Sequence, residues 1–385
     1  MSAEYAPLHE VRKTLRPRWY RCPIPIERLR ELSRPSDLQG WFQAGGHLTL
    51  FAGTGALVFL FWSRQNWIGF LAALFAHGTI ASFFGGVATH ELLHGTVFKT
   101  RWLHRPFTYI YSLLSWHYPF EYAVSHTYHH RYTLHPDGDR EVLLPVPPTV
   151  GKTFLLQLFT INLFTKRGRT FGKGGLLPSI IATTRAAFGR VGAFENVDVR
   201  EEWLKAIYAD QPAEVRNTMW FARLTLLFHG SILAYAIATG LWVLPLILTT
   251  PAFIGNWLMY FVALPQHCGL RDNVPDFRKC VRSMKLEPVS EFLYWRMNWH
   301  AEHHMYAGVP CYNLKKLSRE IADQMPEPRT LLGAWREMLG TWKRLQEEPG
   351  YQYDTPIPDT AGRRSAETDN ALERSIGELA PDGLR

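Results

Sequence analysis

Three long stretches of the chain carry no charged side chain, and they constrain the fold more than any other feature. Residues 39–63, 65–90 and 224–270 contain no Asp, Glu, Lys or Arg. A transmembrane helix needs about 20 mainly apolar residues, so the first two runs are each long enough for one span and the third for two. The alternative is helices buried in a soluble core, but three such runs are hard to place in a soluble domain of this size.

The runs predict an all-α integral membrane protein with about four transmembrane helices in two hairpins. The expected spans cover about 43–62, 66–87, 220–239 and 242–263. Each hairpin returns the chain to the side on which it started. The remaining polar segments are expected to form a helical cytosolic cap on that side.

The flanking segments complete the expected organisation. Residues 1–40 form a cytosolic N-terminal arm, 41–320 the membrane domain, and 321–350 a cytosolic helical extension. Residues 351–385 are polar and lack Trp, Phe and Val, which predicts a disordered tail.

The charge distribution indicates orientation and excludes one class of partner. A basic cluster precedes the first span, so the positive-inside rule places the N-terminus, and after two hairpins the C-terminus, in the cytoplasm. The cluster consists of Arg12, Lys13, Arg16, Arg18 and Arg21. The net charge is +8, but the other basic residues are spread along the polar segments, so we do not expect nucleic-acid binding.

Eight histidines are gathered in three short clusters, each beside or after an apolar stretch. The clusters are His90-Glu-Leu-Leu-His94, His126-Thr-Tyr-His129-His130 and His300-Ala-Glu-His303-His304. Offsets of three and four residues place side chains on one face of a helix. Imidazole is the commonest metal-ligand side chain. Eight imidazoles are too many for one tetrahedral ion and enough for two, and the two hairpins bring all three clusters to the same side of the membrane.

The first cluster by itself allows a different interpretation. His90-Glu91-x-x-His94 matches the H-E-x-x-H helix of zinc metalloproteases, in which the glutamate is the general base. A membrane zinc protease therefore stays a minor alternative. It needs one further metal ligand, and it leaves the other clustered histidines unexplained.

The second and third clusters share the pattern H-x-x-H-H downstream of an H-x-x-x-H, and here the sequence resembles the membrane fatty acid desaturase superfamily. The resemblance covers roughly residues 40–320. It implies a pair of iron ions held by the three histidine boxes at the cytosolic membrane boundary. Members often have a further histidine ahead of the third box, and His267 is the candidate here. The acyl-CoA branch has an Asn four residues before that histidine, whereas this chain has Ala263, which leaves the branch open.

Metal-bound histidines usually donate their second N–H to a carboxylate or carbonyl. The polar residues nearest to the boxes in sequence are therefore expected to surround the ligands. They are Glu91, Asp137, Asp139, Asn298 and Glu302.

The resemblance implies oxygen-dependent removal of two vicinal hydrogens from a fatty acyl chain or lipid, with O₂ as co-substrate. A hydroxylase, decarboxylase or other C–H-oxidising oxygenase on the same scaffold is the main alternative, because the motifs hardly separate these outcomes. The chain has no glycine fingerprint for a dinucleotide, no ferredoxin cysteine set and no cytochrome b5 haem site. Electrons are therefore expected from a separate ferredoxin or cytochrome b5 type protein. The basic residues Lys166, Arg167 and Arg169 are candidates for docking that donor or for contacting anionic lipid.

Overall fold

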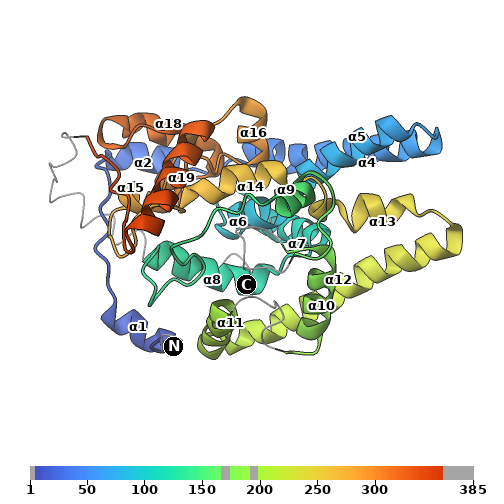
Figure 1. Ribbon diagram of the computed structural model, residues 1–385, viewed down its shortest axis with the longest axis horizontal. Helices are drawn as coiled ribbons and strands as arrows, with labels where there is room; N and C mark the ends of the chain where they lie inside the picture. Colours follow the sequence, from blue (N-terminus) through green and yellow to red (C-terminus); the bar gives the residue numbers. More distant parts are fainter. Residues whose placement is uncertain (1–4, 166–173, 191–197, 359–385) are drawn as a thin grey trace.

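The computed structural model describes residues 5–165, 174–190 and 198–358, and this part of the chain is mostly helical. Its one sheet is a parallel pair of two-residue strands, β1 (Met284–Lys285) and β2 (Arg329–Thr330). Long helices project from one end of the molecule, and shorter helices form a cap at the other end (Figure 1).

The first two charge-free runs form a helical hairpin, as predicted. Asp37–Ser63 and Trp67–Leu93 are both long and apolar enough to cross a membrane. The first consists of α3 (Asp37–Gly40), the π-helical turn η1 (Trp41–Gly45) and α4 (Gly46–Ser63). The second consists of α5 (Trp67–Ala81), the π-helical turn η2 (Phe84–Ala88) and α6 (Thr89–Leu93). The second helix is longer than expected, so it carries His90 itself and ends beside His94.

The third candidate span is α12 (Pro212–Thr239), and it begins eight residues before the expected start at 220. Pro212 occupies the first turn, where a missing N–H costs nothing. The helix ends at Gly240, whose φ of +75° is easily adopted only by glycine.

The expected fourth transmembrane helix over residues 242–263 is not a single helix. The chain forms α13 (Val243–Leu248), the 3-10 turn η4 (Pro251–Phe253) and α14 (Trp257–Ala263). Pro251 and Gly255, with a φ of +59°, interrupt the helix. A Cβ on Gly255 would lie 2.9 Å from Thr79 Oγ1, so the break also depends on close contact with α5. The segment predicted as the fourth span is therefore interrupted, and the structure has three continuous candidate spans among its described residues.

Hydrogen bonds from neighbouring segments satisfy the backbone groups that the break exposes. Asn162 N–H donates to the Phe253 carbonyl (2.7 Å), and Gly255 N–H donates to the Thr160 carbonyl (2.9 Å). Thr79 Oγ1 donates to the Gly255 carbonyl at 3.0 Å. A buried break in a helix is tolerated in an apolar setting only when such partners are present.

The cap is built from short helices that carry the second and third histidine boxes. α7 (His104–Ser115) and α8 (Pro119–Tyr132) follow the first hairpin, and α17 (His300–Met305) lies between α15 (Phe277–Cys280) and α18 (Cys311–Glu320). The other elements are α1 (Leu8–Thr14), α2 (Ile26–Leu32), η3 (Arg101–Leu103), α9 (Lys152–Phe159), α10 (Leu176–Ala187), α11 (Asp198–Asp210), η5 (Leu264–Gln266), α16 (Pro288–Leu293), η6 (Ala322–Gln324) and α19 (Leu331–Glu347).

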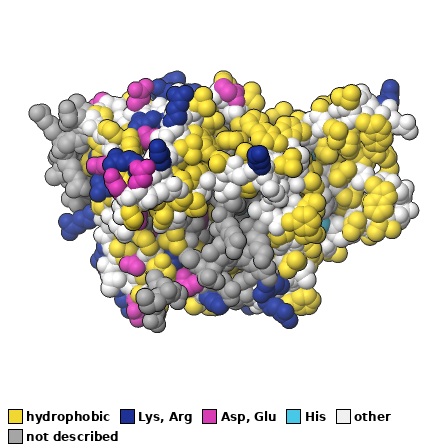
Figure 2. Space-filling model, viewed as in Figure 1, with side chains coloured by type: hydrophobic (Ala, Val, Ile, Leu, Met, Phe, Trp, Pro, Cys, Tyr) yellow, Lys and Arg dark blue, Asp and Glu magenta, His cyan; other side chains and the backbone are white. Residues whose placement is uncertain are grey.

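The surface divides in the same way as the fold. Hydrophobic side chains cover much of the end formed by α4, α5, α12 and α13, whereas most charged side chains gather over the cap (Figure 2). Exposed aromatic and aliphatic residues such as Phe59, Trp67, Leu71 and Tyr235 lie on these helices. An apolar surface of this extent on long helices is typical of a protein that sits in lipid.

Candidate metal centre

The first histidine box lies at the cap end of the second long helix. A π-helical turn at Phe84–Ala88 separates α5 from α6, and such turns often occur at functional sites. A Cβ on Gly85 would lie 3.2–3.3 Å from Ser115 and His117, so this turn packs closely against the end of α7 and the segment that follows it. His90 and His94 are one helical turn apart, and their Nε2 atoms are 3.4 Å from each other.

The second box lies on α8, which Pro119 begins, and the third on α17. In each H-x-x-H-H motif, the first and last histidines are four residues apart and share a helix face. The middle histidine directly precedes the last one, so it points about 100° away around the helix. Each motif therefore supplies two imidazoles in one direction and a third in another.

The structure brings the nine predicted ligands into two groups, in which His94 and His130 are partly buried and the other histidines are buried. In each group, one ligand atom per residue lies within 4.8 Å of every other. The five-histidine group contains His90, His94, His126, His130 and His303. The four-histidine group contains His129, His267, His300 and His304. The middle histidine of each H-x-x-H-H motif lies in a different group from the other two histidines of its motif. His129 belongs to the four-histidine group, and His303 belongs to the five-histidine group.

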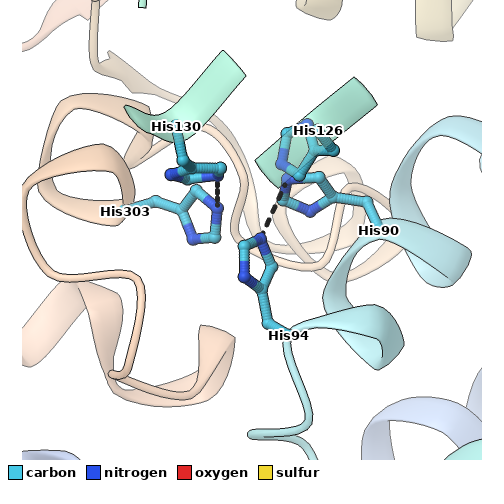
Figure 3. A group of neighbouring side chains, drawn as sticks. All are labelled: His90, His94, His126, His130 and His303. Carbon is cyan, nitrogen blue, oxygen red and sulfur yellow. Dashed lines mark hydrogen bonds between the residues drawn. The ribbon is translucent and has the colours of Figure 1, made fainter. Parts of the chain in front are cut away.

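Figure 3 shows the five-histidine group, whose imidazoles from all three boxes converge on a common space. His130 and His303 come from different boxes, and their Nε2 atoms are 3.2 Å apart. In the four-histidine group, His300 Nε2 lies 3.0 Å from His267 Nε2 and 3.2 Å from His304 Nε2.

Two observations indicate that these residues suit a metal ion. Ring nitrogens that point at one another at these separations share either a proton or a metal ion, because two facing lone pairs repel. His126 Nε2 is buried and has no hydrogen-bond partner among the described residues. Nine converging imidazoles without a carboxylate among them form a donor set that iron, zinc, copper and nickel accept.

Burial also keeps the ligands in the form that binds metal. It lowers the pKa of His94 and of His267 to about 3. The pKa values of His130 and His304 lie well below the usual range, because of burial and then the neighbouring imidazoles. These side chains are therefore neutral at physiological pH, as ligation requires.

Two of the expected outer partners contact the ligands. Glu91 Oε1 lies 2.9 Å from His90 Nδ1 and 3.7 Å from His303 Nδ1, although neither pair is aligned as a hydrogen bond. Asp139 Oδ2 lies 2.8 Å from His129 Nδ1 and is aligned as one.

Asp139 and His129 each favour the charged form of the other. Burial would raise the pKa of Asp139, but His129 and the N–H groups of Leu134 and Glu141 hold it below its usual value. Burial likewise opposes a charge on His129, and Asp139 outweighs it, so the pKa of His129 is raised.

The other expected partners lie elsewhere. Asp137 is exposed, because the turn closed by the Gly138 N–H on the His135 carbonyl directs it outward. Asn298 Nδ2 donates to the Met284 carbonyl at 2.8 Å. Glu302 is buried against Ser283, which donates to its Oε2. Asn298 and Glu302 therefore hold the backbone around the third box, and no described contact joins either side chain to an imidazole of the two groups.

Three partners were missed by sequence reasoning. Glu141 Oε1 lies 3.2 Å from His126 Nδ1, Thr133 Oγ1 lies 3.0 Å from His304 Nδ1, and the Cys280 carbonyl lies 3.2 Å from His267 Nδ1. The sequence could have indicated Glu141, because it lies two residues beyond Asp139. In an extended chain, side chains two residues apart point to the same side. A backbone carbonyl has no sequence signal.

The family comparison decides what kind of protein carries this centre. The chain matches the model of the fatty acid desaturase family over residues 65–334, which is more than half of its length. The chain belongs to the fatty acid desaturase family. Membership makes this chain an oxidoreductase of a membrane family known for a di-iron cofactor. A comparison with curated proteins found no match.

Proposed function

We propose that this desaturase-family protein is an oxygen-dependent di-iron desaturase that introduces a double bond into a fatty acyl chain or lipid at the cytosolic membrane face. The observation that carries the proposal is the pair of histidine groups at the cap end of the apolar helices. Iron and O₂ supply the oxidising power to break an unactivated C–H bond, which amino-acid side chains lack.

The donor set supports iron over a structural zinc. Zinc in structural sites is almost always four-coordinate and tetrahedral, so five imidazoles exceed what it takes. The five-histidine and four-histidine groups would each hold one Fe²⁺. An ion that accepts six ligands would keep at least one further position open in each group.

The protein's part is to orient the imidazoles and to exclude water. His126, His129 and His304 each direct Nδ1 to a protein oxygen, which turns Nε2 toward the centre. Asp139 holds the proton of His129 at Nδ1 and keeps Nε2 available. Burial of the groups keeps bulk water from a reactive centre.

The membrane location suits an insoluble substrate. The first box is on the same helix as the second apolar run, so the centre lies at the end of a helix that a hydrocarbon chain in the bilayer would contact. Two electrons per turnover come from a separate ferredoxin or cytochrome b5 type protein. The residues first considered for its docking, Lys166, Arg167 and Arg169, lie outside the described residues. In this proposal both termini are cytoplasmic.

The zinc-protease alternative is less well supported, because of where Glu91 lies. A general base must reach a metal-bound water. Glu91 instead lies beside the Nδ1 atoms of His90 and His303, on the outer side of the imidazoles.

The test is expression in a lipid-producing host, followed by mass spectrometry of lipids and metal analysis of the purified protein. We expect acyl chains two hydrogens lighter without added oxygen, two irons per chain, and loss of the product and of one iron in His303→Ala. An alcohol product would show that the reaction is hydroxylation and not desaturation. One zinc per chain and no iron would overturn the di-iron proposal.

A further inference from the structure

The short segment Asp139-Arg140-Glu141, here called the 139–141 segment, contacts one imidazole of each histidine group. Asp139 reaches His129 in the four-histidine group (2.8 Å), and Glu141 reaches His126 in the five-histidine group (3.2 Å). The Glu141 N–H also donates to Asp139 Oδ1 at 2.9 Å. A displacement of this segment would therefore disturb both groups together.

Arg140 points the other way and anchors the segment to α11. Its side chain is fully buried and pairs with Glu202, which is 41% exposed. Its guanidinium lies 4.9 Å from the ring centre of Trp203. A buried guanidinium is costly unless it is paired, so these contacts fix where the segment lies.

Trp203 also belongs to a hydrogen-bonded chain that ends at a predicted metal ligand. Trp203 Nε1 donates to Ser125 Oγ at 3.0 Å, and Ser125 Oγ donates to Glu141 Oε2 at 2.6 Å. Glu141 Oε1 then faces His126 Nδ1. All four side chains are largely shielded from solvent, since His126 is 8% and Glu141 14% exposed.

The hydrogen count of this chain determines the tautomer of His126. An indole N–H only donates, and the one hydroxyl hydrogen of Ser125 is used on Glu141. Glu141 accepts at both oxygens, so the shared proton with His126 lies on Nδ1. The lone pair of His126 is then on Nε2, the buried atom that has no hydrogen-bond partner among the described residues.

We propose that Trp203 on α11 is a positioning residue for the metal centre, acting on His126 through Ser125 and Glu141. The inference rests on the proposed function only in requiring iron in the five-histidine group. Trp203 touches neither metal nor substrate. Through Ser125 it fixes the position of the Glu141 carboxylate, which in turn orients His126. Arg140 connects the same helix to the 139–141 segment, whose Asp139 contacts the four-histidine group.

The expected effects decrease along the chain of contacts. Loss of an outer partner of a metal ligand typically costs about 10–100-fold in metal affinity. Glu141→Gln is expected to fall in that range, since the amide has lost the charge and one acceptor. Trp203→Phe keeps the ring stacked on Arg140 and removes only the N–H. It should weaken iron binding by a smaller factor, about 3–10-fold, at the same group.

The experiment loads each variant with iron-57 and records Mössbauer spectra of the reduced protein together with chelator titrations. Glu141→Gln and Trp203→Phe should alter the same one of the two ferrous signals. In the Glu141→Gln background, Trp203→Phe should cause almost no further loss of iron affinity, because the chain is already interrupted. Ser125→Ala is a smaller change that interrupts the same chain of hydrogen bonds. It should weaken iron binding in the same way as Trp203→Phe, and it keeps the test valid if Trp203→Phe folds poorly.

Trp335→Phe is the matched control. It also removes one indole hydrogen bond, 2.8 Å to the Phe261 carbonyl, but no described chain of side-chain hydrogen bonds joins it to His126. It should leave both iron signals unchanged. Two unchanged iron signals in Trp203→Phe and Ser125→Ala, or losses that simply add to that of Glu141→Gln, would overturn the positioning role. Wild-type protein that binds no iron would instead overturn the proposed function.

Discussion

The two histidine groups are built from the same motifs but are surrounded differently. The five-histidine group takes imidazoles from all three boxes, with the carboxylates of Glu91 and Glu141 behind them. The four-histidine group takes none from the first box, and His267 completes it. Its outer partners are one carboxylate, Asp139, with the neutral Thr133 hydroxyl and the Cys280 carbonyl.

This difference shows that the two sites are not equivalent. An imidazole backed by a carboxylate is a more basic ligand than one backed by a neutral oxygen. The five-histidine group therefore has more protein ligands and more negative charge beside them. We expect it to hold iron more tightly, whereas the four-histidine group leaves more positions open.

The largest effect should come from removing one ligand of either group. His94→Ala should empty mainly the five-histidine group and His267→Ala mainly the four-histidine group. Each should lower activity by at least about 100-fold, more than the loss of an outer partner. Metal analysis after dialysis should find close to one iron per chain in both variants.

His104→Gln is the control for this prediction, since His104 is a buried histidine outside both groups that accepts from the Phe98 N–H at 3.1 Å. It should keep both irons. Complete loss of iron from both single-ligand variants would contradict separate sites.

Neutralising the carboxylate of the four-histidine group should have the next largest effect. Asp139→Asn keeps the shape but removes the charge that holds the His129 proton at Nδ1. We expect about a 10–100-fold loss of iron affinity, larger in the four-histidine group. Glu91→Gln is the paired variant and should act on the five-histidine group. Chelator titrations followed by iron-specific spectra measure both, and an equal effect of each variant on both irons would refute the assignment.

A smaller effect is expected at Thr133, whose hydroxyl donates to the His129 carbonyl (2.6 Å) and faces His304 Nδ1 (3.0 Å). Since its one hydrogen is used on the carbonyl, the hydroxyl accepts from His304. Thr133→Val keeps the shape and leaves the His304 N–H unpaired, at a cost of about 1–3 kcal/mol in unfolding free energy. Thermal unfolding measures this cost, and Thr133→Ser should recover most of it. A fully stable valine variant would show that the hydroxyl is not needed.

The smallest effect concerns burial, which both groups share. In the folded protein the pKa of His94 and of His267 is about 3, whereas an exposed imidazole titrates near 6.5. Below about pH 6.5 the unfolded chain therefore binds protons that the folded chain does not, and stability falls as the pH drops toward 3. The raised pKa values of His129 and Glu302 act in the opposite direction. More groups have lowered pKa values, however, since those of His130 and His304 are lowered as well.

Metal-free protein should therefore melt a few degrees lower at about pH 5.5 than at about pH 7.5. Differential scanning fluorimetry in detergent tests this expectation, and a higher melting point at the lower pH would contradict it.

The sequence predicted the parts of this architecture that depend on local pattern. Charge-free runs identified the helices at 43–62, 66–87 and 220–239, because a long apolar segment has few other stable structures. It also named all nine histidines that the structure brings together. The break near Gly255 was missed because it depends on contact with Thr79 and pairing with residues 160–162, which lie far away in the sequence.

Outer partners were predicted less well than ligands for a similar reason. Asp137 and Asp139 are equivalent by sequence distance, and only the turn at His135 decides which one faces inward. Glu141 and Trp203 matter through a chain of hydrogen bonds from α11, and no motif marks such a chain. Of the disordered tail expected at 351–385, residues 359–385 lie outside the described residues.

The divided motifs on α8 and α17 have a consequence for how the two sites move. Within each helix, neighbouring histidines serve opposite groups, and their Cα atoms are fixed about 3.8 Å apart by the covalent chain. The spacing between the two sites is therefore set by peptide geometry and not by loop packing. Because α8 and α17 each contribute histidines to both groups, a displacement of either helix moves ligands of both sites together.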